Sequence, residues 1–139
     1  MRDFEVSADA PNQSVEHGVV PGGASFPRAA RLLKHSDFER VYNQGRRHFS
    51  SHMTVFYLRQ AEGEARVGIT VGRALGGAVE RNRIKRRLRE AVRRRRSALK
   101  APVDVVINPK KSVLTVEFPV LLEEVSRAFE RIAKKLVEK

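Results

Sequence analysis

Apolar residues recur at helical spacing in three segments of this chain, and the first of these segments is the shortest. Its apolar positions follow an i, i+3, i+4 pattern and are Phe38, Val41 and Tyr42. Ser36 followed by Glu39 predicts a capping box at the start of a helix, and Gly45 stands where a helix C-cap is expected. We therefore predict a short helix from about Ser36 to Gln44.

Four further segments have strand character. Residues 52–60 (HMTVFYLRQ) are rich in β-branched and aromatic side chains, and in residues 65–71 (ARVGITV) apolar positions alternate with smaller or polar ones. The short EGE sequence between them predicts an antiparallel pair joined by a tight turn. Residues 46–50 are expected to add an edge strand before this pair. Residues 102–109 (PVDVVINP) form a nearly all-apolar run between prolines, which is typical of a buried strand.

The second helical segment is strongly basic, since ten of the seventeen residues in ERNRIKRRLREAVRRRR are Arg or Lys. With Ile84 at zero and about 100° per residue, the aliphatic side chains fall between about −40° and +80°. They are Leu88, Ala91, Val92, Ala98 and Leu99. The opposite sector, from about 100° to 200°, holds Asn82, Lys85, Arg86, Arg89, Arg93, Arg96 and Lys100. The pattern predicts an amphipathic helix with one side in the core and one cationic face.

The last helical segment follows Pro119, a residue that suits a first helical turn. Its apolar residues are Leu121, Leu122, Val125, Phe129, Ile132 and Leu136. The predicted order of elements is therefore α-β-β-β-α-β-α. This order is typical of an α/β (α+β) two-layer sandwich, in which helices pack on a small mixed sheet.

Net charge divides the chain into two parts. Residues 1–25 contain one arginine and four acidic residues, a net charge of −3, whereas residues 26–139 carry +15, which gives the total of +12. The first part also contains prolines and a Gly-Gly pair and has no sustained periodicity. We therefore expect a flexible acidic N-terminal arm over residues 1–25 and a single folded domain over residues 26–139.

The basic charge predicts a polyanionic partner, with nucleic acid as the first candidate and an anionic membrane surface as the second. Charged helix faces are often merely solvated, but such faces usually mix signs, and here only Glu80 and Glu90 oppose ten cations. No apolar run approaches the roughly 18 residues that span a bilayer, and the first ten residues lack the order of a signal peptide. We expect a cytoplasmic protein that binds nucleic acid and no membrane.

Groups that could catalyse a reaction are sparse. His48 and His52 are four residues apart, but HFSSH lacks the glutamate of a zincin. The acidic residues form no pair placed for acid-base or two-metal chemistry. The glycines of GRALGGAVE are not followed by the GK[ST] of a phosphate-binding loop, and there is no cysteine. We expect neither a catalytic residue nor a metal site in this chain.

Two segments carry a resemblance to a known family. Residues 66–91 (RVGITVGRALGGAVERNRIKRRLREA) closely resemble the signature region of the bacterial ribonuclease P protein component, in which a strand, a short glycine-containing connection and an RNRxKRxxRE helix follow one another. Residues 31–47 (RLLKHSDFERVYNQGRR) resemble the start of that family's fold. The resemblance covers about residues 28–135, whereas residues 1–25 have no counterpart in it.

The resemblance implies the protein subunit of the ribonuclease P endoribonuclease. In that family the protein assists a catalytic RNA, which holds the reactive Mg²⁺ ions and removes the 5′ leader from precursor tRNA. It implies one protein bound to each catalytic RNA, and it accounts for the lack of catalytic groups in this chain. It also implies an unusual left-handed crossover between the strand before the basic helix and the strand after it, where the general default is right-handed.

The resemblance also assigns two RNA-binding surfaces to the folded domain. Contacts with the catalytic RNA are implied for Arg81, Asn82, Arg83, Lys85, Arg86, Arg89 and Arg93. The single-stranded leader is implied to bind in a cleft between the first helix and the sheet, at Phe38, Tyr42 and Phe56. Aromatic rings can stack on unpaired bases with little sequence preference. The helical spacing of Phe38 and Tyr42 is also that of core residues, so for these two the cleft and the core stay open as alternatives.

Two other functions share the same charge and the same lack of catalytic groups. A ribosomal or other structural RNA-binding protein would be equally compatible if the RNRIKR motif were absent. A DNA-compacting protein is the second alternative, although the sequence offers no dimerisation motif or recognition helix of a known pattern. Cleavage of precursor tRNA by a bacterial catalytic RNA together with this protein would separate ribonuclease P from both.

Overall fold

The computed structural model of this chain describes residues 30–32 and 34–138. The described helices and strands are α2 (His35–Gln44), β1 (Arg46–Phe49), β2 (Met53–Arg59), β3 (Arg66–Ile69), α3 (Ala78–Arg95), β4 (Val103–Pro109) and α4 (Phe118–Glu138). Short 3₁₀ helices between them are η3 (Arg73–Leu75), η4 (Arg96–Ala98) and η5 (Lys111–Leu114). Over the described residues the order of helices and strands is α-β-β-β-α-β-α, as predicted. The predicted arm over residues 1–25 lies outside the described residues.

The four described strands form one mixed sheet in the order β1-β2-β4-β3. Strand β2 pairs antiparallel with both β1 and β4, whereas β3 pairs parallel with β4. The predicted hairpin between β2 and β3 is wrong, because β4, which follows α3 in the chain, lies between these two strands in the sheet. The connection from β3 through α3 to β4 is the crossover for which the resemblance implies a left hand, and that handedness stays a prediction.

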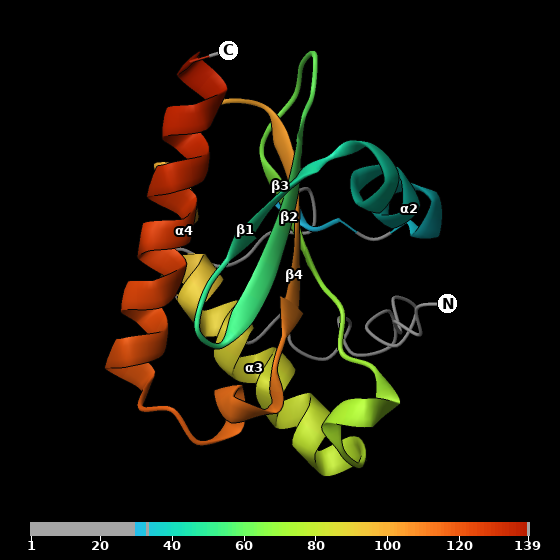
Figure 1. The fold of residues 1–139 in the computed structure, drawn as a ribbon, viewed down its shortest axis with the longest axis vertical. Coiled ribbons are helices and arrows are strands. Elements are labelled where there is room, and N and C mark those ends of the chain that lie inside the picture. Colours follow the sequence, from blue (N-terminus) through green and yellow to red (C-terminus); the bar gives the residue numbers. More distant parts are fainter. Residues whose placement is uncertain (1–29, 33, 139) are drawn as a thin grey trace.

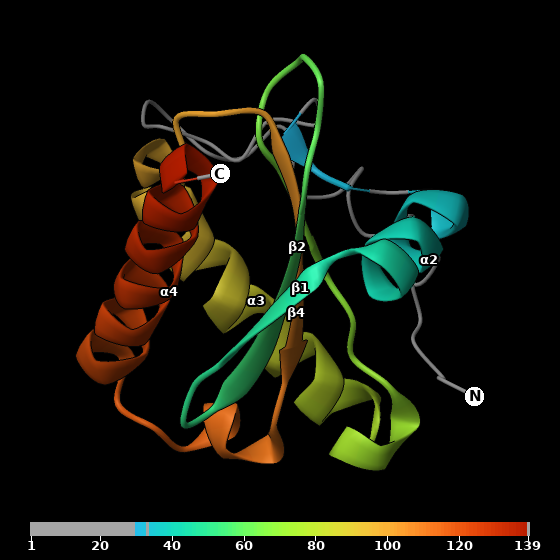
Figure 2. The ribbon, with the colours of Figure 1, turned by 45° about the horizontal axis from the view of Figure 1, so that its top comes forward.

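Helices cover both faces of the sheet, with α3 and α4 on one face and α2 on part of the other (Figures 1 and 2). The larger core lies between the sheet and helices α3 and α4. Its fully buried helical residues include Ile84, Leu88, Ala91, Val92, Leu121, Val125, Phe129 and Ile132. The predicted core side of the basic helix is therefore confirmed, and Leu99 is buried as well, although it lies beyond α3 and directly follows η4.

The smaller core lies between α2 and the opposite face of the sheet. Phe38 and Val41 of α2 are fully buried there against Leu32 and Val106. A Cβ atom at Gly68 of β3 would overlap Cζ of the Phe38 ring, so this position accepts no side chain unless the ring moves. The close approach of α2 to β3 therefore depends on a glycine whose role is to leave room for an aromatic ring.

The ends of α2 only partly follow the sequence pattern. The helix begins at His35, and its N-cap residue Lys34 makes no side-chain capping hydrogen bond, so the predicted capping box of Ser36 and Glu39 is not formed. At the other end Gly45 is the C-cap, as predicted, and its N–H donates to the carbonyl oxygen of Val41 at 2.8 Å. Packing against the sheet, more than local capping, thus fixes the position of this helix.

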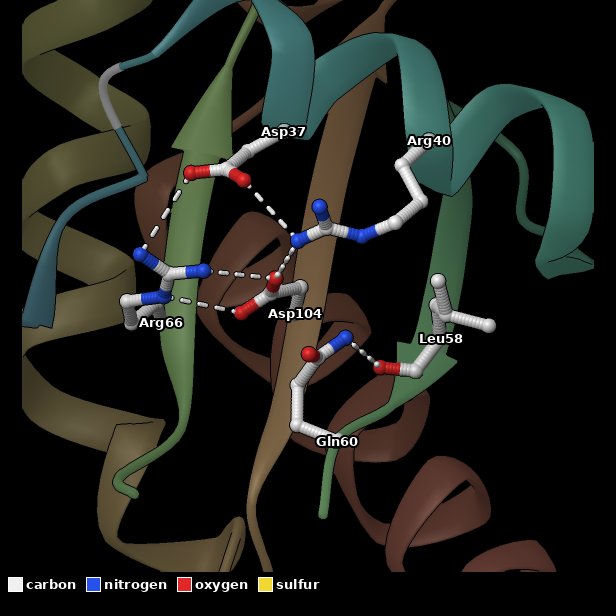
Figure 3. Close-up of polar contacts among 6 residues, drawn as sticks. All are labelled: Asp37, Arg40, Leu58, Gln60, Arg66 and Asp104. Carbon is white, nitrogen blue, oxygen red and sulfur yellow. Dashed lines mark hydrogen bonds and ion pairs between the residues drawn. The ribbon is translucent and has the colours of Figure 1, made fainter. Parts of the chain in front are cut away.

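A buried ion-pair network joins α2 to the two parallel strands (Figure 3). Asp104 of β4 is fully buried and accepts hydrogen bonds from Nε and Nη2 of Arg66 on β3, at 2.9 Å and 2.8 Å. Arg40 of α2 donates to Asp37 at 2.8 Å and lies 3.5 Å from Asp104. Hydrogen bonding to Asp104 raises the pKa of Arg66, so this guanidinium stays charged.

The contact between Gly68 and Phe38 can be tested by overpacking. Gly68→Ala should lower the free energy of unfolding by about 1–3 kcal/mol, because the new methyl group overlaps the ring. Urea denaturation measures this loss. In a double-mutant cycle with Phe38→Leu, the shorter side chain should accept the methyl group, so the combined loss should be smaller than the sum of the two single losses. Additive losses would show that the glycine is not constrained by this ring.

Candidate nucleic-acid interface

Helix α3 starts with a capping interaction that uses its own first acidic residue. The backbone N–H of Gly77 donates to Oε1 of Glu80 at 2.7 Å, and the N–H of Arg81 donates to the carbonyl oxygen of Gly77 at 2.9 Å. A carboxylate in the first turn also interacts favourably with the positive end of the helix dipole. The start of the basic helix is thereby fixed immediately before the RNRIKR motif.

The predicted RNA-contact residues of α3 differ in exposure. Arg83 and Arg86 are exposed, and so is the neutral amide of Asn82. We call these three residues the exposed basic cluster. Arg81, Arg89 and Arg93 are half-buried. Lys85 is only 7% exposed, so its placement on the cationic face is corrected. The reason is geometric, since Lys85 lies about 100° from Ile84, at the boundary between the apolar and the cationic sectors.

A carboxylate in the middle of α3 holds two of its arginines. Glu90 accepts hydrogen bonds from Nε and Nη2 of Arg93, at 3.1 Å and 2.6 Å, and from Nε of Arg94 at 2.7 Å. The hydrogen bond from Arg93 is the main cause that lowers the pKa of Glu90 to about 2. Arg93 and Arg94 are therefore partly neutralised within the helix, whereas the exposed basic cluster lies nearer the N-terminal end of α3.

Two arginines of α3, Arg87 and again Arg94, also contact the segment around the start of α4. Nη2 of Arg87 donates to the carbonyl oxygen of Val116, and the guanidinium of Arg94 lies 5.4 Å from the centroid of the Phe118 ring. Both contacts orient basic side chains toward the protein instead of toward a ligand. The sequence pattern predicted a cationic helix but did not separate Arg87 and Arg94, which make these contacts, from the arginines of the exposed basic cluster.

The second predicted surface, between α2 and the sheet, contains two of its three aromatic residues. Tyr42 and Phe56 are half-buried, and their rings meet edge to face with centroids 4.9 Å apart. We call them the aromatic pair. Phe38 is fully buried in the smaller core, so of its two alternatives the core is the observed one, and its ring offers no face to a ligand.

Hydrogen bonds hold Tyr42 of the aromatic pair in place. The hydroxyl of Tyr42 donates to Oδ1 of Asn108 at 2.7 Å, and the same oxygen accepts from the hydroxyl of Thr70 at 2.5 Å. Asn108 belongs to β4 and Thr70 directly follows β3, so Tyr42 is tied to the sheet across 66 positions of sequence. Asn108 and Asp104 are the two polar residues of the mainly apolar strand β4, and this was the signal that could have identified Asn108 as a partner.

Two residues of the edge strand β1 lie beside the aromatic pair and were missed by the sequence analysis. Arg47 is the cross-strand neighbour of Phe56, and its guanidinium carbon lies 5.6 Å from the centroid of that ring. The same carbon lies 6.0 Å from the ring of Phe49, two residues further along β1. Because alternate residues of a strand share one face, the RRHF sequence could have placed both side chains on the face of Phe56.

His48 and His52 are both half-buried. His52 Nδ1 lies 2.7 Å from the hydroxyl of Ser112, and its backbone N–H donates to Oε2 of Glu124 at 2.7 Å. Burial, followed by the nearby charge of Arg131, lowers the pKa of His48.

Across residues 30–32 and 34–138, no group of three or more His, Asp or Glu side chains is arranged to hold a metal ion. No helix in the same part of the chain is both long and apolar enough to cross a membrane.

Comparison with known proteins gives one consistent result. The model of the ribonuclease P family matches residues 26–133. The ribonuclease P protein component of Dictyoglomus thermophilum is 36% identical over 68% of this chain and 80% of its own length. The corresponding protein of Symbiobacterium thermophilum is 41% identical over 75% of this chain and 91% of its own length.

Solved structures agree with this result. The RNase P protein from Thermotoga maritima superimposes with a TM-score of 0.66 at 28% identity, over 73% of this chain and 96% of its own. The Staphylococcus aureus RNase P protein gives a TM-score of 0.65 at 28% identity, over 77% of this chain and 97% of its own. With the matched sequence motif and the observed fold, these similarities establish that the chain belongs to the bacterial ribonuclease P protein family.

Proposed function

We propose that this chain is the protein subunit of ribonuclease P, which binds the catalytic RNA and the single-stranded 5′ leader of precursor tRNA and so promotes removal of the leader. The observation that carries the proposal is the exposed basic cluster of α3, which lies within the RNRIKR motif. The relatives that match this chain are named as protein components of ribonuclease P.

The chemistry of the exposed basic cluster suits the backbone of a folded RNA. Arg83 and Arg86 are three residues apart, and side chains at this spacing are neighbours on a helix surface. Guanidinium groups bind phosphate oxygens through paired N–H donors, while the amide of Asn82 can both donate and accept. The other side of α3 is locked in the larger core, so these groups are presented without ordering a flexible segment.

The chemistry of the aromatic pair suits unpaired bases. Tyr42 and Phe56 offer ring surfaces that every base can stack on, and Arg47 supplies a positive charge beside them. Stacking of this kind has little sequence preference, which suits a protein that must accept many different leaders. In this proposal the reactive Mg²⁺ ions are held by the catalytic RNA, and one protein binds each RNA.

Reconstitution tests the proposal directly. The full chain, added to a bacterial ribonuclease P RNA and precursor tRNA at low Mg²⁺, should strongly increase the rate of 5′ cleavage, because its cations replace part of the screening that Mg²⁺ supplies between RNA phosphates. Gel analysis of end-labelled precursor measures the rate. A ribosomal or DNA-compacting protein of equal charge would bind RNA without increasing cleavage at the correct site, and that result would reject the proposal.

Removing one exposed charge should weaken assembly with the catalytic RNA. Arg86→Ala should lower affinity and reduce the slope of log K against log salt by somewhat less than about one unit, the release expected for one phosphate contact. Arg94→Ala is the matched control, because Glu90 and Phe118 already hold that arginine, and its slope should change little. Asn82→Ala should lose affinity with little change in slope. Equal slopes for Arg86→Ala and the unmodified protein would contradict a phosphate contact at Arg86.

Leader binding should depend on the ring of Phe56. Phe56→Leu keeps much of the apolar volume but removes the stacking face, so precursor tRNA with a long leader should bind more weakly by about 1–3 kcal/mol while mature tRNA is little affected. Fluorescence titration of both RNAs measures the difference. Phe38→Leu is the control, since this buried ring should affect the melting temperature but not the preference for a leader. Equal deficits for both RNAs would show that Phe56 is only a packing residue.

A further inference from the structure

Phe49 at the end of β1 is a large apolar side chain exposed on the face of the sheet that carries Phe56. Its side chain is 70% exposed, and it is the one aromatic among the large hydrophobic residues exposed in the described part of the chain. Single exposed apolar residues are common. Phe49 differs because an arginine lies against its ring and because the strand pairing places it in line with the aromatic pair.

The register of β1 and β2 fixes this line. Arg47 pairs with Phe56 and Phe49 pairs with Thr54, so Arg47, Phe49 and Phe56 project from the same face of the sheet. The Arg47 guanidinium lies 5.6 Å from one ring centroid and 6.0 Å from the other. A continuous row of stacking groups therefore runs from Tyr42 on α2, across Phe56 and Arg47, to Phe49 at the edge of the sheet.

We propose that Phe49 and Arg47 form an additional nucleotide subsite, in which an unpaired base stacks on the Phe49 ring and its phosphate pairs with Arg47. The inference rests on the proposed function, because it extends the leader-binding surface beyond Tyr42 and Phe56. The occupant is a single RNA strand, since β1 carries Arg46, Arg47 and His48 and no acidic residue. An apolar protein partner would require a contiguous apolar patch, which one ring flanked by cations does not supply.

A series of precursor tRNAs with increasing leader length tests the subsite. For the unmodified protein in the reconstituted complex, affinity should rise with leader length and then level off. Phe49→Leu should leave the shortest leaders unaffected, level off at a shorter leader and weaken long-leader binding by about fivefold or more, the lower end of the effect of one stacked base. Phe49→Tyr, which keeps a ring, should restore the unmodified curve. Val137→Ala, a change at a residue 77% exposed on α4, is the control and should have no effect.

The outcomes separate this inference from the proposed function. If the curve of Phe49→Leu matches that of the unmodified protein at every length, or is lowered equally at every length, the subsite is rejected while leader binding at the aromatic pair stands. If the unmodified protein itself shows no dependence on leader length, the proposed leader binding fails and the subsite fails with it. Phe49 is largely exposed, so circular dichroism and the melting temperature of Phe49→Leu should match those of the unmodified protein.

Discussion

The carboxylate of Asp104 is fully buried on β4, one of the two interior strands, and the arginines around it connect α2 to the sheet beside the packing of Phe38 and Val41. Removing a carboxylate from water costs several kcal/mol, which is offset only where geometry is good and its oxygens are hydrogen-bonded. Arg66 meets that condition with two hydrogen bonds, and Arg40 brings α2 to the same group. The network thereby joins segments that are far apart in sequence, and together with that packing it sets the position of the helix that carries Tyr42.

Helices and strands could be predicted because their signals are local. The core side of α3 follows from a 3.6-residue period that no distant contact changes, and Ile84, Leu88 and Val92 are buried as that period requires. Strand pairing is not local. The turn between β2 and β3 is typical of a hairpin. In the structure the nearly fully buried strand β4, which follows α3 in the chain, lies between them. No short stretch of sequence contains the information that excludes the hairpin.

The candidate site was predictable to the extent that chemistry follows from position on a single element. The motif identified the exposed residues Asn82, Arg83 and Arg86. A helical projection could not place Lys85, because this residue lies at the boundary of two sectors. It also could not predict the hydrogen bonds between Arg93 and Glu90, because these depend on side-chain conformation. Phe38 was ambiguous for a different reason. Whether a ring on α2 is covered depends on the residue that faces it, and the facing residue, Gly68, belongs to a strand thirty positions away.

The two proposed RNA surfaces share one rigid support, and this has a consequence for how they act together. Along β4, Val105 and Ile107 pack into the larger core beneath α3, while Val106 and Asn108 face α2 and the aromatic pair. Because interior packing is dense and resists deformation, the exposed basic cluster and the aromatic pair are held at a fixed separation. In the proposed function, the catalytic RNA binds the exposed basic cluster and thereby positions the protein. The aromatic pair then binds the leader without further ordering of the protein, so this second contact loses less entropy than it would on a flexible chain. The long-range charge of +12 speeds encounter with any RNA, but the rigid spacing of the two surfaces is what can select a partner pair of matching geometry.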